Sequence, residues 1–364
     1  MLAFIFGKNW ALSLAELLSY FERDGIEWKF VDLTKKALVI EGEVLPAAID
    51  DLGGTLKIVQ IDRWFDFKDL KKQDFGEYVD WPISFYASHL LFKDVKKIFK
   101  NFPKDGVLSH TYLIKKKQRE VCLIFGLKSC YFGETVAVSD PYDFKKRDEG
   151  RPVQRPDLSI SPSRARILVN LSQARESILD PFCGIGTIGQ EALLSGIERI
   201  YLSDIDKKAV EWTKKNVEWA KKAFRKKANV ATKAADARDL KDISVEAIAT
   251  EPDLGPKLQY RINKADAEQI MGYLTNLYRA FFRSAMRVLK REGRVAIVLP
   301  CINSKTGKVF VNKKFDGYRM VDLFERIPEE YRRYLKMRST ILDEEREEGK
   351  TRVVVREFCV YRKV

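Results

Sequence analysis

The sequence predicts an α/β protein whose C-terminal half is an open, mainly parallel sheet with a ligand site at one edge. The first observation is Ile178–Gly189, where a short strand, a glycine-rich turn and a helix start follow one another. The second is Asp204, which follows another apolar strand, Ile200–Ser203. The third is the order strand, helix, two strands, helix and strand over residues 1–62, which predicts a smaller α+β domain ahead of that sheet.

Length and composition indicate an ordinary globular protein of two or three domains. The 364 residues are 45% hydrophobic and 32% charged. We see no signal peptide and no apolar run that approaches a membrane span, so we expect a cytoplasmic protein. Only two histidines are present, and no C-x-x-C spacing occurs, so we expect no metal site. The five cysteines are expected to be free thiols in a reducing compartment: Cys122, Cys130, Cys183, Cys301 and Cys359.

The acid at the strand end identifies the ligand of the glycine turn. Gly184, Gly186 and Gly189 have the spacing G-x-G-x-x-G, which is a weak signal on its own. A carboxylate at Asp180 would repel the pyrophosphate of a dinucleotide. It would attract the ammonium and sulfonium groups of S-adenosylmethionine (SAM). Asp204 would accept hydrogen bonds from the ribose of either ligand, so it does not discriminate. We therefore favour SAM over a dinucleotide and over glycines that only form a turn.

Five short segments carry a resemblance to known methyltransferases. DPFCGIGT, from Asp180 to Thr187, followed by YLSDID resembles the RNA and DNA amino-methyltransferases of the Rossmann-like SAM class. Upstream, RDEGRP (147–152), SPSRAR (161–166) and LVNL (168–171) resemble the linker of the THUMP-containing tRNA guanosine N2-methyltransferases that act at position ten of tRNA. The resemblance implies SAM as cofactor and tRNA as partner. It also implies a Rossmann-like SAM-dependent methyltransferase domain with a seven-stranded sheet, preceded by α+β ferredoxin-like and THUMP-like domains.

The resemblance also implies domain limits and cofactor contacts. We expect a ferredoxin-like domain at 1–62, a THUMP-like RNA-binding domain at 63–139, a linker at 140–162 and the methyltransferase domain at 163–364. The expected cofactor-binding residues surround the glycine turn and the two following strand ends: Asp180, Pro181, Phe182, Gly184, Gly186, Thr187, Asp204, Ile205, Asp236 and Ala237.

The net charge of +14 suggests a polyanionic partner. A lysine-rich surface of the kind found in heat-adapted proteins is the alternative. Taken singly, the basic runs are more typical of solvated surfaces: Lys115, Lys116 and Lys117 form one, and Arg225–Lys227 another. Together with a methyltransferase domain, the charge favours nucleic acid.

The N-terminal elements follow a βαββαβ order, which is typical of a ferredoxin-like fold but compatible with many functions. We expect strands and helices at Leu2–Phe6, Leu12–Phe21, Trp28–Leu33, Ala37–Ile40, Leu45–Leu52 and Leu56–Ile61. Within the THUMP-like region we expect further elements at Ile83–Leu91, Lys93–Phe102, Leu108–Ile114, Val121–Phe125 and Phe132–Val138.

Lysines of the THUMP-like region would contact RNA phosphates, unless they only keep a helix hydrated. The candidates are Lys96, Lys97, Lys100, Lys104, Lys115, Lys116 and Lys117. Contacts of this kind would position an RNA without reading its sequence.

Prolines, glycine and mixed charges predict a linker over 140–162. Because it matches the family's linker, we expect it to be ordered beside the cofactor pocket. A helix over Ser163–Leu171 would cover the mouth of that pocket. Four arginines are candidate RNA contacts, and for the last two a structural ion pair is equally open: Arg147, Arg151, Arg164 and Arg166.

A basic helix is expected from Lys207 to Phe224. Trp212 and Trp219 share one face of it, and we favour core packing over base stacking for both. A strand over Asn229–Ala235 leads to Asp236, whose position in the family implies a hydrogen bond with the adenine amino group. The alternative is that Asp236 is an acidic residue of a loop that only contacts solvent.

The strand Ala247–Thr250 is followed by Glu251-Pro252-Asp253-Leu254-Gly255-Pro256. In the family an acid or Asn is followed here by two prolines and an aromatic residue, so Asp253 and Leu254 are departures. We expect Glu251 to Leu254 to form the catalytic tip. The Glu251 carboxylate and the Pro252 carbonyl oxygen would accept both N–H groups of a guanine amine, so that its lone pair faces the methyl donor. Tyr260 or Phe182 would have to replace the missing aromatic ring.

Methyl transfer would then be an in-line displacement that depends on the alignment of amine, methyl group and sulfur, and the amine would lose its proton afterwards.

The remaining expected elements are a helix over 267–289, a strand Gly293–Leu299, an element Val321–Arg326 and a strand Arg352–Tyr361. The last two would close the sheet as an antiparallel hairpin.

Three functions remain open at this point. The favoured one is an active tRNA guanosine N2-methyltransferase. The second is a SAM- and RNA-binding protein that no longer catalyses. The third is an amino-methyltransferase that acts on rRNA or on DNA. We expect a monomer, and the sequence argues neither for nor against the small zinc-binding activator that some eukaryotic relatives require.

Overall fold

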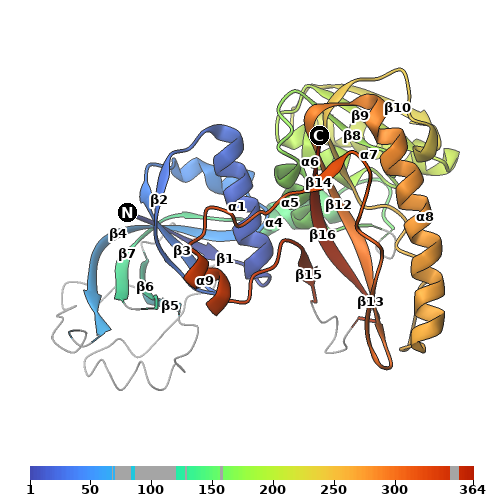
Figure 1. Cartoon of the computed structure of the whole chain (residues 1–364). Coiled ribbons are helices and arrows are strands. Elements are labelled where there is room, and N and C mark those ends of the chain that lie inside the picture. Colours follow the sequence, from blue (N-terminus) through green and yellow to red (C-terminus); the bar gives the residue numbers. More distant parts are fainter. Residues whose placement is uncertain (68, 70–82, 87–119, 128, 156–158, 345–351) are drawn as a thin grey trace. The chain divides into compact units, whose positions relative to one another are not determined.

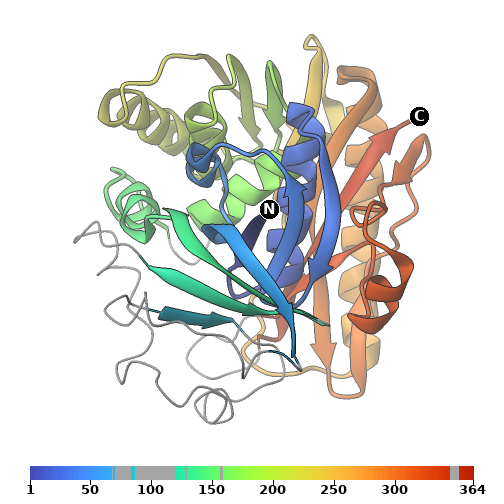
Figure 2. The ribbon, with the colours of Figure 1, turned by 90° about the vertical axis from the view of Figure 1, so that its left-hand side faces the viewer.

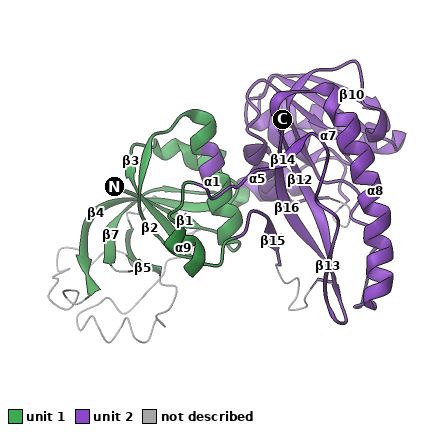
Figure 3. Cartoon of the chain, viewed as in Figure 1, with its two compact units in different colours: residues 1–17, 21–142, 326–337 green, residues 18–20, 143–325, 338–364 purple. Residues whose placement is uncertain are grey.

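The computed structural model describes residues 1–67, 69, 83–86, 120–127, 129–155, 159–344 and 352–364 (Figure 1). The chain divides into two compact units, coloured separately in Figure 3. Unit 1 comprises residues 1–17, 21–142 and 326–337, and unit 2 comprises residues 18–20, 143–325 and 338–364. Within the described residues, no helix is both long and apolar enough to cross a membrane.

Unit 1 is built on a seven-stranded sheet with the order β2-β3-β1-β4-β7-β6-β5. Its first four strands pair antiparallel in the arrangement that the βαββαβ pattern predicts. The elements are β1 (Leu2–Phe6), α1 (Trp10–Asp24), β2 (Trp28–Leu33), β3 (Ala37–Gly42), η1 (Pro46–Asp51), β4 (Thr55–Asp66), β5 (Ile83–Tyr86), β6 (Val121–Phe125) and β7 (Ser129–Val138). The ferredoxin-like expectation for this part is confirmed at the level of fold.

Strand β4 continues past residue 62, the predicted domain limit, and pairs with β7 as far as Asp66. The two N-terminal domains that we predicted therefore share one sheet. The expected strands at Val121–Phe125 and Phe132–Val138 are present as β6 and β7.

Much of the THUMP-like region lies outside the described residues, so its assignment stays a prediction. This holds for the expected helix at Lys93–Phe102 and the expected strand at Leu108–Ile114. It holds equally for the candidate RNA-contacting lysines, which are Lys96, Lys97, Lys100, Lys104, Lys115, Lys116 and Lys117.

A segment from late in the sequence belongs to unit 1. Helix α9 (Glu329–Tyr334) brings Tyr331, whose hydroxyl donates to Oδ1 of the buried Asp32 at 3.0 Å. The hydroxyl of Tyr131 donates to Oδ2 of the same carboxylate at 3.1 Å. The ring of Tyr331 also packs edge-on against Phe30. Asp32 thus ties β7 and α9 to β2.

Unit 2 is built on a sheet with the order β10-β9-β8-β11-β12-β16-β14. The first five of these strands are parallel, and β16 is antiparallel to both of its neighbours. The strands are β8 (Ser177–Asp180), β9 (Arg199–Asp204), β10 (Asn229–Ala234), β11 (Val245–Thr250), β12 (Leu289–Ser304), β13 (Gly307–Phe310), β14 (Tyr318–Met320), β15 (Ile341–Asp343) and β16 (Val354–Lys363). This is the predicted Rossmann-like arrangement of seven strands.

Two details differ from the expectation. Besides the seven strands in that order, β13 and β15 pair with β12 and β16, so the described residues form a sheet of nine strands. The element expected at Val321–Arg326 is neither helix nor strand, and the short β14 just before it pairs with β16 instead.

Helices cover both faces of this sheet. The helical elements are α4 (Pro141–Glu149), α5 (Pro162–Ser172), α6 (Thr187–Leu194), α7 (Lys207–Ala223), η5 (Ala237–Asp239) and α8 (Lys264–Val288). Helix α8 runs along β12 and β13 in Figures 1 and 2, and its apolar side packs on alternate residues of β12 such as Val295 and Ile297. Helices α5, α6 and α7 pack against the other face. The carboxyl ends of β8, β9 and β11 therefore meet at one edge, where the ligand of such a sheet binds.

Candidate active site

The glycine turn between β8 and α6 adopts a conformation that favours glycine at two positions. Gly184 has φ +53° and Gly186 has φ +86°, both in the left-handed region. A Cβ atom on Gly186 would also lie 3.1 Å from the Thr213 methyl group. The turn is closed by the amide of Gly186, which donates to the carbonyl oxygen of Cys183 at 2.7 Å. These glycines are therefore required by the geometry of the loop.

Asp180 lies at the end of β8 and is 2% exposed. Its Oδ1 accepts hydrogen bonds from the Thr250 hydroxyl at 2.7 Å and from the Phe182 amide at 3.2 Å. The pKa of this carboxyl is raised from its ordinary 3.8 to about 7, mainly by burial and in smaller part by the nearby carboxylates of Asp204 and Glu251. The protein therefore keeps an acid here at a cost in stability.

Asp204 ends the next strand and supports the turn. Its Oδ2 accepts from the amide of Gly184 at 2.9 Å, and its Oδ1 accepts from the amide of Asp206 at 3.0 Å. The following side chain, Ile205, is 69% exposed. Asp204, which we expect to bind the ribose, therefore lies beside the glycine turn, and the exposed side chain of Ile205 follows it.

The three carboxylates of Asp180, Asp204 and Glu251 form what we call the acidic edge. They interact electrostatically across the carboxyl ends of β8, β9 and β11. A negative edge attracts a cationic ligand and repels phosphate groups. In the described residues no group of three or more His, Cys, Asp or Glu side chains is arranged to hold a metal ion.

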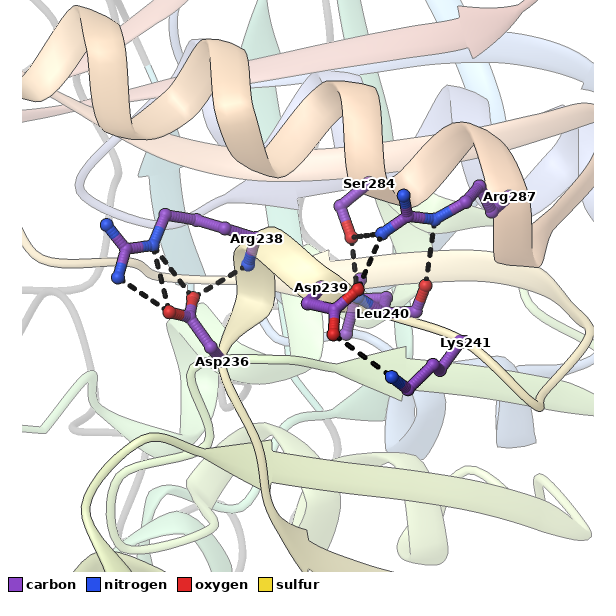
Figure 4. A network of polar contacts seen from close by, with 7 residues as sticks. All are labelled: Asp236, Arg238, Asp239, Leu240, Lys241, Ser284 and Arg287. Atoms are coloured by element: carbon purple, nitrogen blue, oxygen red, sulfur yellow. Dashed lines mark hydrogen bonds and ion pairs between the residues drawn. The ribbon is translucent and has the colours of Figure 1, made fainter.

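Asp236 is positioned differently from the expectation. Its carboxylate accepts two hydrogen bonds from the Arg238 side chain, at 3.0 Å from Nε and 2.6 Å from Nη2 (Figure 4). These bonds hold the pKa of Asp236 below its usual range. An adenine amino group would have to share this carboxylate with Arg238. The neighbouring Ala237 is buried in the core that packs on α8.

The rest of this turn is fixed to α8. The amide of Leu240 donates to the Ser284 hydroxyl at 2.6 Å, and Nε of Arg287 donates to the carbonyl oxygen of Leu240 at 3.1 Å. Asp239 joins the same network through ion pairs with Arg287 and Lys241 (Figure 4). The loop after β10 is thereby held at a fixed position along the helix.

The expected catalytic tip, residues 251–254, is held by two contacts that the sequence did not reveal. The Glu251 carboxylate forms an ion pair with the Arg356 guanidinium of β16, and both side chains are largely buried. The hydroxyl of Tyr278, on α8, donates to the carbonyl oxygen of Asp253 at 2.5 Å. Tyr278 is fully buried, and burial raises its pKa above the ordinary value, so it remains a donor.

The residues that depart from the family pattern also have a structural role. Oδ1 of Asp253 accepts from the amide of Gly255 at 2.9 Å, and Gly255 has φ +91°. Asp253 therefore closes a tight turn that a second proline could not close in the same way. Leu254 is half-buried, and Tyr260 is 75% exposed further along the loop.

Two of the predicted RNA-contacting arginines are buried. Arg147 and Arg166 are 7% and 3% exposed, and both pair with the same Glu191 oxygen, at 2.7 and 3.0 Å. Such side chains cannot reach an RNA phosphate from where they lie. For Arg166 this is the structural ion pair that we had left open, and for Arg147 it corrects the expected RNA contact; the two pairs tie α4 and α5 to α6.

Arg151 is buried as well, and it donates to the Thr187 hydroxyl at 2.7 Å and pairs with Asp148 at 2.6 Å. It therefore fixes the linker to the first residue of α6, which corrects its assignment as an RNA contact. Arg164 is only partly buried and pairs with Asp343 of β15. The linker itself is not irregular throughout, because Pro141–Glu149 form α4.

Comparisons with known proteins agree with this fold. Residues 151–314 match the family model described as UPF0020, an RMKL-like methyltransferase domain. A tRNA (guanine(10)-N2)-dimethyltransferase of Methanothermobacter thermautotrophicus is 36% identical over 159 residues, which are 42% of this chain and 43% of that protein. One of the same name from Pyrococcus abyssi is 36% identical over 160 residues, 44% of each chain. The chain thus matches less than half the length of these curated relatives.

One solved structure resembles the whole chain in fold. The crystal structure of TrmN from Thermus thermophilus matches with a TM-score of 0.53 at 16% identity, over 100% of this chain and 99% of that one. At this identity the likeness concerns the fold alone.

Proposed function

We propose that the chain is a SAM-dependent tRNA (guanine-N2-)methyltransferase, acting on a guanosine such as that at position ten, because residues 151–314 match the model of the UPF0020 methyltransferase domain. The acidic edge is the observation that carries this proposal. Three carboxylates at the ends of three parallel strands, beside a glycine turn, suit a cationic ligand and not a dinucleotide. The names of the two curated relatives support the nucleotide and the RNA class.

The residues around the glycine turn fit SAM, which supplies an electrophilic methyl group on a sulfonium. Asp180 would hold the charge of the amino acid part, and Asp204 would accept from the ribose hydroxyls. Ile205 and Phe182 would provide apolar surface for the adenine. Pro181, Gly184, Gly186, Thr187, Asp236 and Ala237 remain proposed members of the same site.

At the catalytic tip, the Glu251 carboxylate and the Pro252 carbonyl oxygen would accept the two N–H groups of the guanine amine. The Arg356 guanidinium fixes the direction of the Glu251 carboxylate, and the Tyr278 hydroxyl fixes the backbone of Asp253. Because the amine needs alignment more than a strong base, a carboxylate oriented in this way is sufficient.

A second candidate function follows from the missing aromatic ring at Leu254. A target base is normally stacked between aromatic or apolar side chains once it is turned out of its helix. A chain without that ring could bind SAM and RNA without transferring a methyl group. An enzyme acting on rRNA or DNA is the third candidate.

For the whole chain we further propose a cytoplasmic monomer with a THUMP-like region at 63–139 and a linker at 140–162. Within the THUMP-like region, Lys115, Lys116 and Lys117 remain proposed contacts to RNA phosphates. The net charge of +14 supports a polyanionic partner for the chain.

The test is methyl transfer from labelled SAM to an unmodified tRNA transcript, followed by mass spectrometry of the nucleosides. We expect N2-methylguanosine or its dimethyl form, and no product on rRNA fragments or duplex DNA. Binding of both SAM and tRNA without transfer would support the second candidate. Asp204→Ala should weaken SAM binding in calorimetry while tRNA binding is nearly unchanged. Equal loss of both would contradict the ribose assignment.

A further inference from the structure

One face of α7 carries an alternating row of lysines and tryptophans. Lys208, Trp212, Lys215, Trp219 and Lys222 follow one another at spacings of four and three residues. At 3.6 residues per turn these five positions lie within an arc of about 80°. We call them the α7 stripe. The three lysines are exposed, and the two tryptophans, for which we expected core packing, are half-buried.

Trp212 holds two cations at the surface. The Arg155 guanidinium lies 5.0 Å from the centre of its ring, and the Lys208 ammonium lies 5.4 Å from it. Contacts of this kind restrict the motion of a long basic side chain while leaving its charge in water. The indole therefore orders two positive charges near the N-terminal end of α7.

The second tryptophan is part of a similar group at the other end of the helix. Trp219 packs edge-on against Phe224, with ring centres 5.6 Å apart. The Lys146 ammonium lies 5.5 Å from the Phe224 ring. A Cβ on Gly150 would meet the Trp219 ring at 3.0 Å, so the chain after α4 passes directly over it. This aromatic pair thus fixes another cation beside the stripe.

The lysines of the stripe are not neutralised by the protein. In the described parts of the chain Lys208, Lys215 and Lys222 pair with no carboxylate, whereas Lys221 on the adjoining row pairs with Glu218 at 2.9 Å. The positive surface continues past the helix into Arg225–Lys227, which are all exposed. The positive charges of these three lysines are therefore available to an anionic partner.

Residues of α7 beside the stripe and farther round the helix support the glycine turn. The Thr213 hydroxyl donates to the carbonyl oxygen of Gly184 at 3.0 Å, and the Asn216 amide donates to that of Ile185 at 2.8 Å. A polymer bound along the stripe would therefore lie over the same helix that shapes the SAM loop.

We propose that the α7 stripe is an RNA-docking surface that binds the phosphate backbone, and this rests on the proposed function. Lys208, Lys215 and Lys222 are spaced seven residues apart, about 10.5 Å along the helix, which suits a regularly charged polyanion better than a single acidic patch. Trp212 holds Arg155 and Lys208 in place, and Trp219 supports Phe224, whose ring contacts Lys146. Such contacts position an RNA without reading its sequence.

The test compares Lys215→Gln/Lys222→Gln with the matched control Lys290→Gln/Arg291→Gln. The control residues are exposed at the start of β12, at the sheet edge opposite the acidic edge, and both variants lose two positive charges. Lys208 is left unchanged so that the contact between its ammonium group and the Trp212 ring is kept. The probe is a fluorescent tRNA transcript, titrated in anisotropy at several salt concentrations.

We expect the stripe variant to bind the tRNA about tenfold more weakly, with the salt slope reduced by the equivalent of about two phosphate contacts. The control should stay within about twofold of the wild type, SAM affinity should be unchanged in both, and Lys215→Arg/Lys222→Arg should retain wild-type binding. Equal losses in stripe variant and control would overturn the docking surface while leaving methyl transfer by the wild type intact. A wild-type chain that bound tRNA but transferred no methyl group would instead contradict the proposed function.

Discussion

Replacing Asp180 with Asn tests the idea that this site gives up stability in order to bind a cation. Both recorded hydrogen bonds to this side chain, from Thr250 and from the Phe182 amide, end on Oδ1. An asparagine can keep both through its own Oδ1. The substitution therefore removes the charge of a buried carboxylate with little change in shape.

The magnitude follows from the pKa of Asp180, which burial raises from 3.8 to about 7. Between about pH 4 and pH 7 the folded chain keeps a proton that the unfolded chain has lost, so stability falls as the pH rises through this window. At about 1.4 kcal/mol per pKa unit, the full cost above pH 7 is about 4 kcal/mol, of which about 3 kcal/mol develops between pH 5 and pH 7. The Asn variant does not have this cost.

Urea unfolding of wild type and Asp180→Asn at pH 5 and pH 8 measures the effect. The stability of the variant relative to the wild type should rise by about 3 kcal/mol between the two pH values. SAM should bind the wild type about tenfold more weakly for each pH unit below 7, because the cation selects the ionised carboxylate. The variant should lose both affinity and pH dependence. A variant that is destabilised equally at both pH values, or that binds SAM normally, would refute the reasoning.

Three further substitutions separate catalysis, positioning and folding. Glu251→Gln should lower the rate of methyl transfer at saturating SAM at least tenfold, because one acceptor becomes a donor; a normal rate in single-turnover assays would mean that the amine is held elsewhere. Tyr278→Phe leaves the carbonyl oxygen of Asp253 without its donor. It should lower kcat while leaving KM for tRNA and the SAM affinity near wild type, and a change confined to thermal stability would assign it a purely structural role. Tyr331→Phe removes a bond to Asp32 and should cost about 1 to 3 kcal/mol in unfolding experiments without altering SAM affinity; an unchanged midpoint would contradict that anchor.

The sheet of unit 2 was predictable because its signals are local. The glycine turn after Asp180 has to be a tight loop, and the acid at Asp204 marks the end of the next strand. The expected strands differ from β8, β9 and β11 by two residues at most, and their carboxyl ends meet at the acidic edge. The placement of the acidic residues at the strand ends could therefore be predicted before any long-range contact was known.

Long-range partners could not be predicted in this way. Nothing in the neighbourhood of Arg147 or Arg166 distinguishes a solvent-exposed guanidinium from a buried one, because the deciding partner, Glu191, lies in another helix. The same holds for Glu251, which meets Arg356 from the end of the chain. A single sequence has no signal for such pairs, and amphipathic spacing alone did not show that Trp212 holds cations at the surface.

The route of the chain around α9 constrains any attempt to handle unit 1 as an independent piece. After Glu325 the polypeptide contributes residues 326–337 to that unit before it resumes unit 2 at Arg338. A truncation product ending at Tyr142 would leave the Asp32 carboxylate without the Tyr331 hydroxyl and would uncover the ring of Phe30. To prepare unit 1 as a separate protein, residues 326–337 have to be supplied as a fused or added peptide. Exchanging unit 1 between relatives requires that this peptide is exchanged together with it.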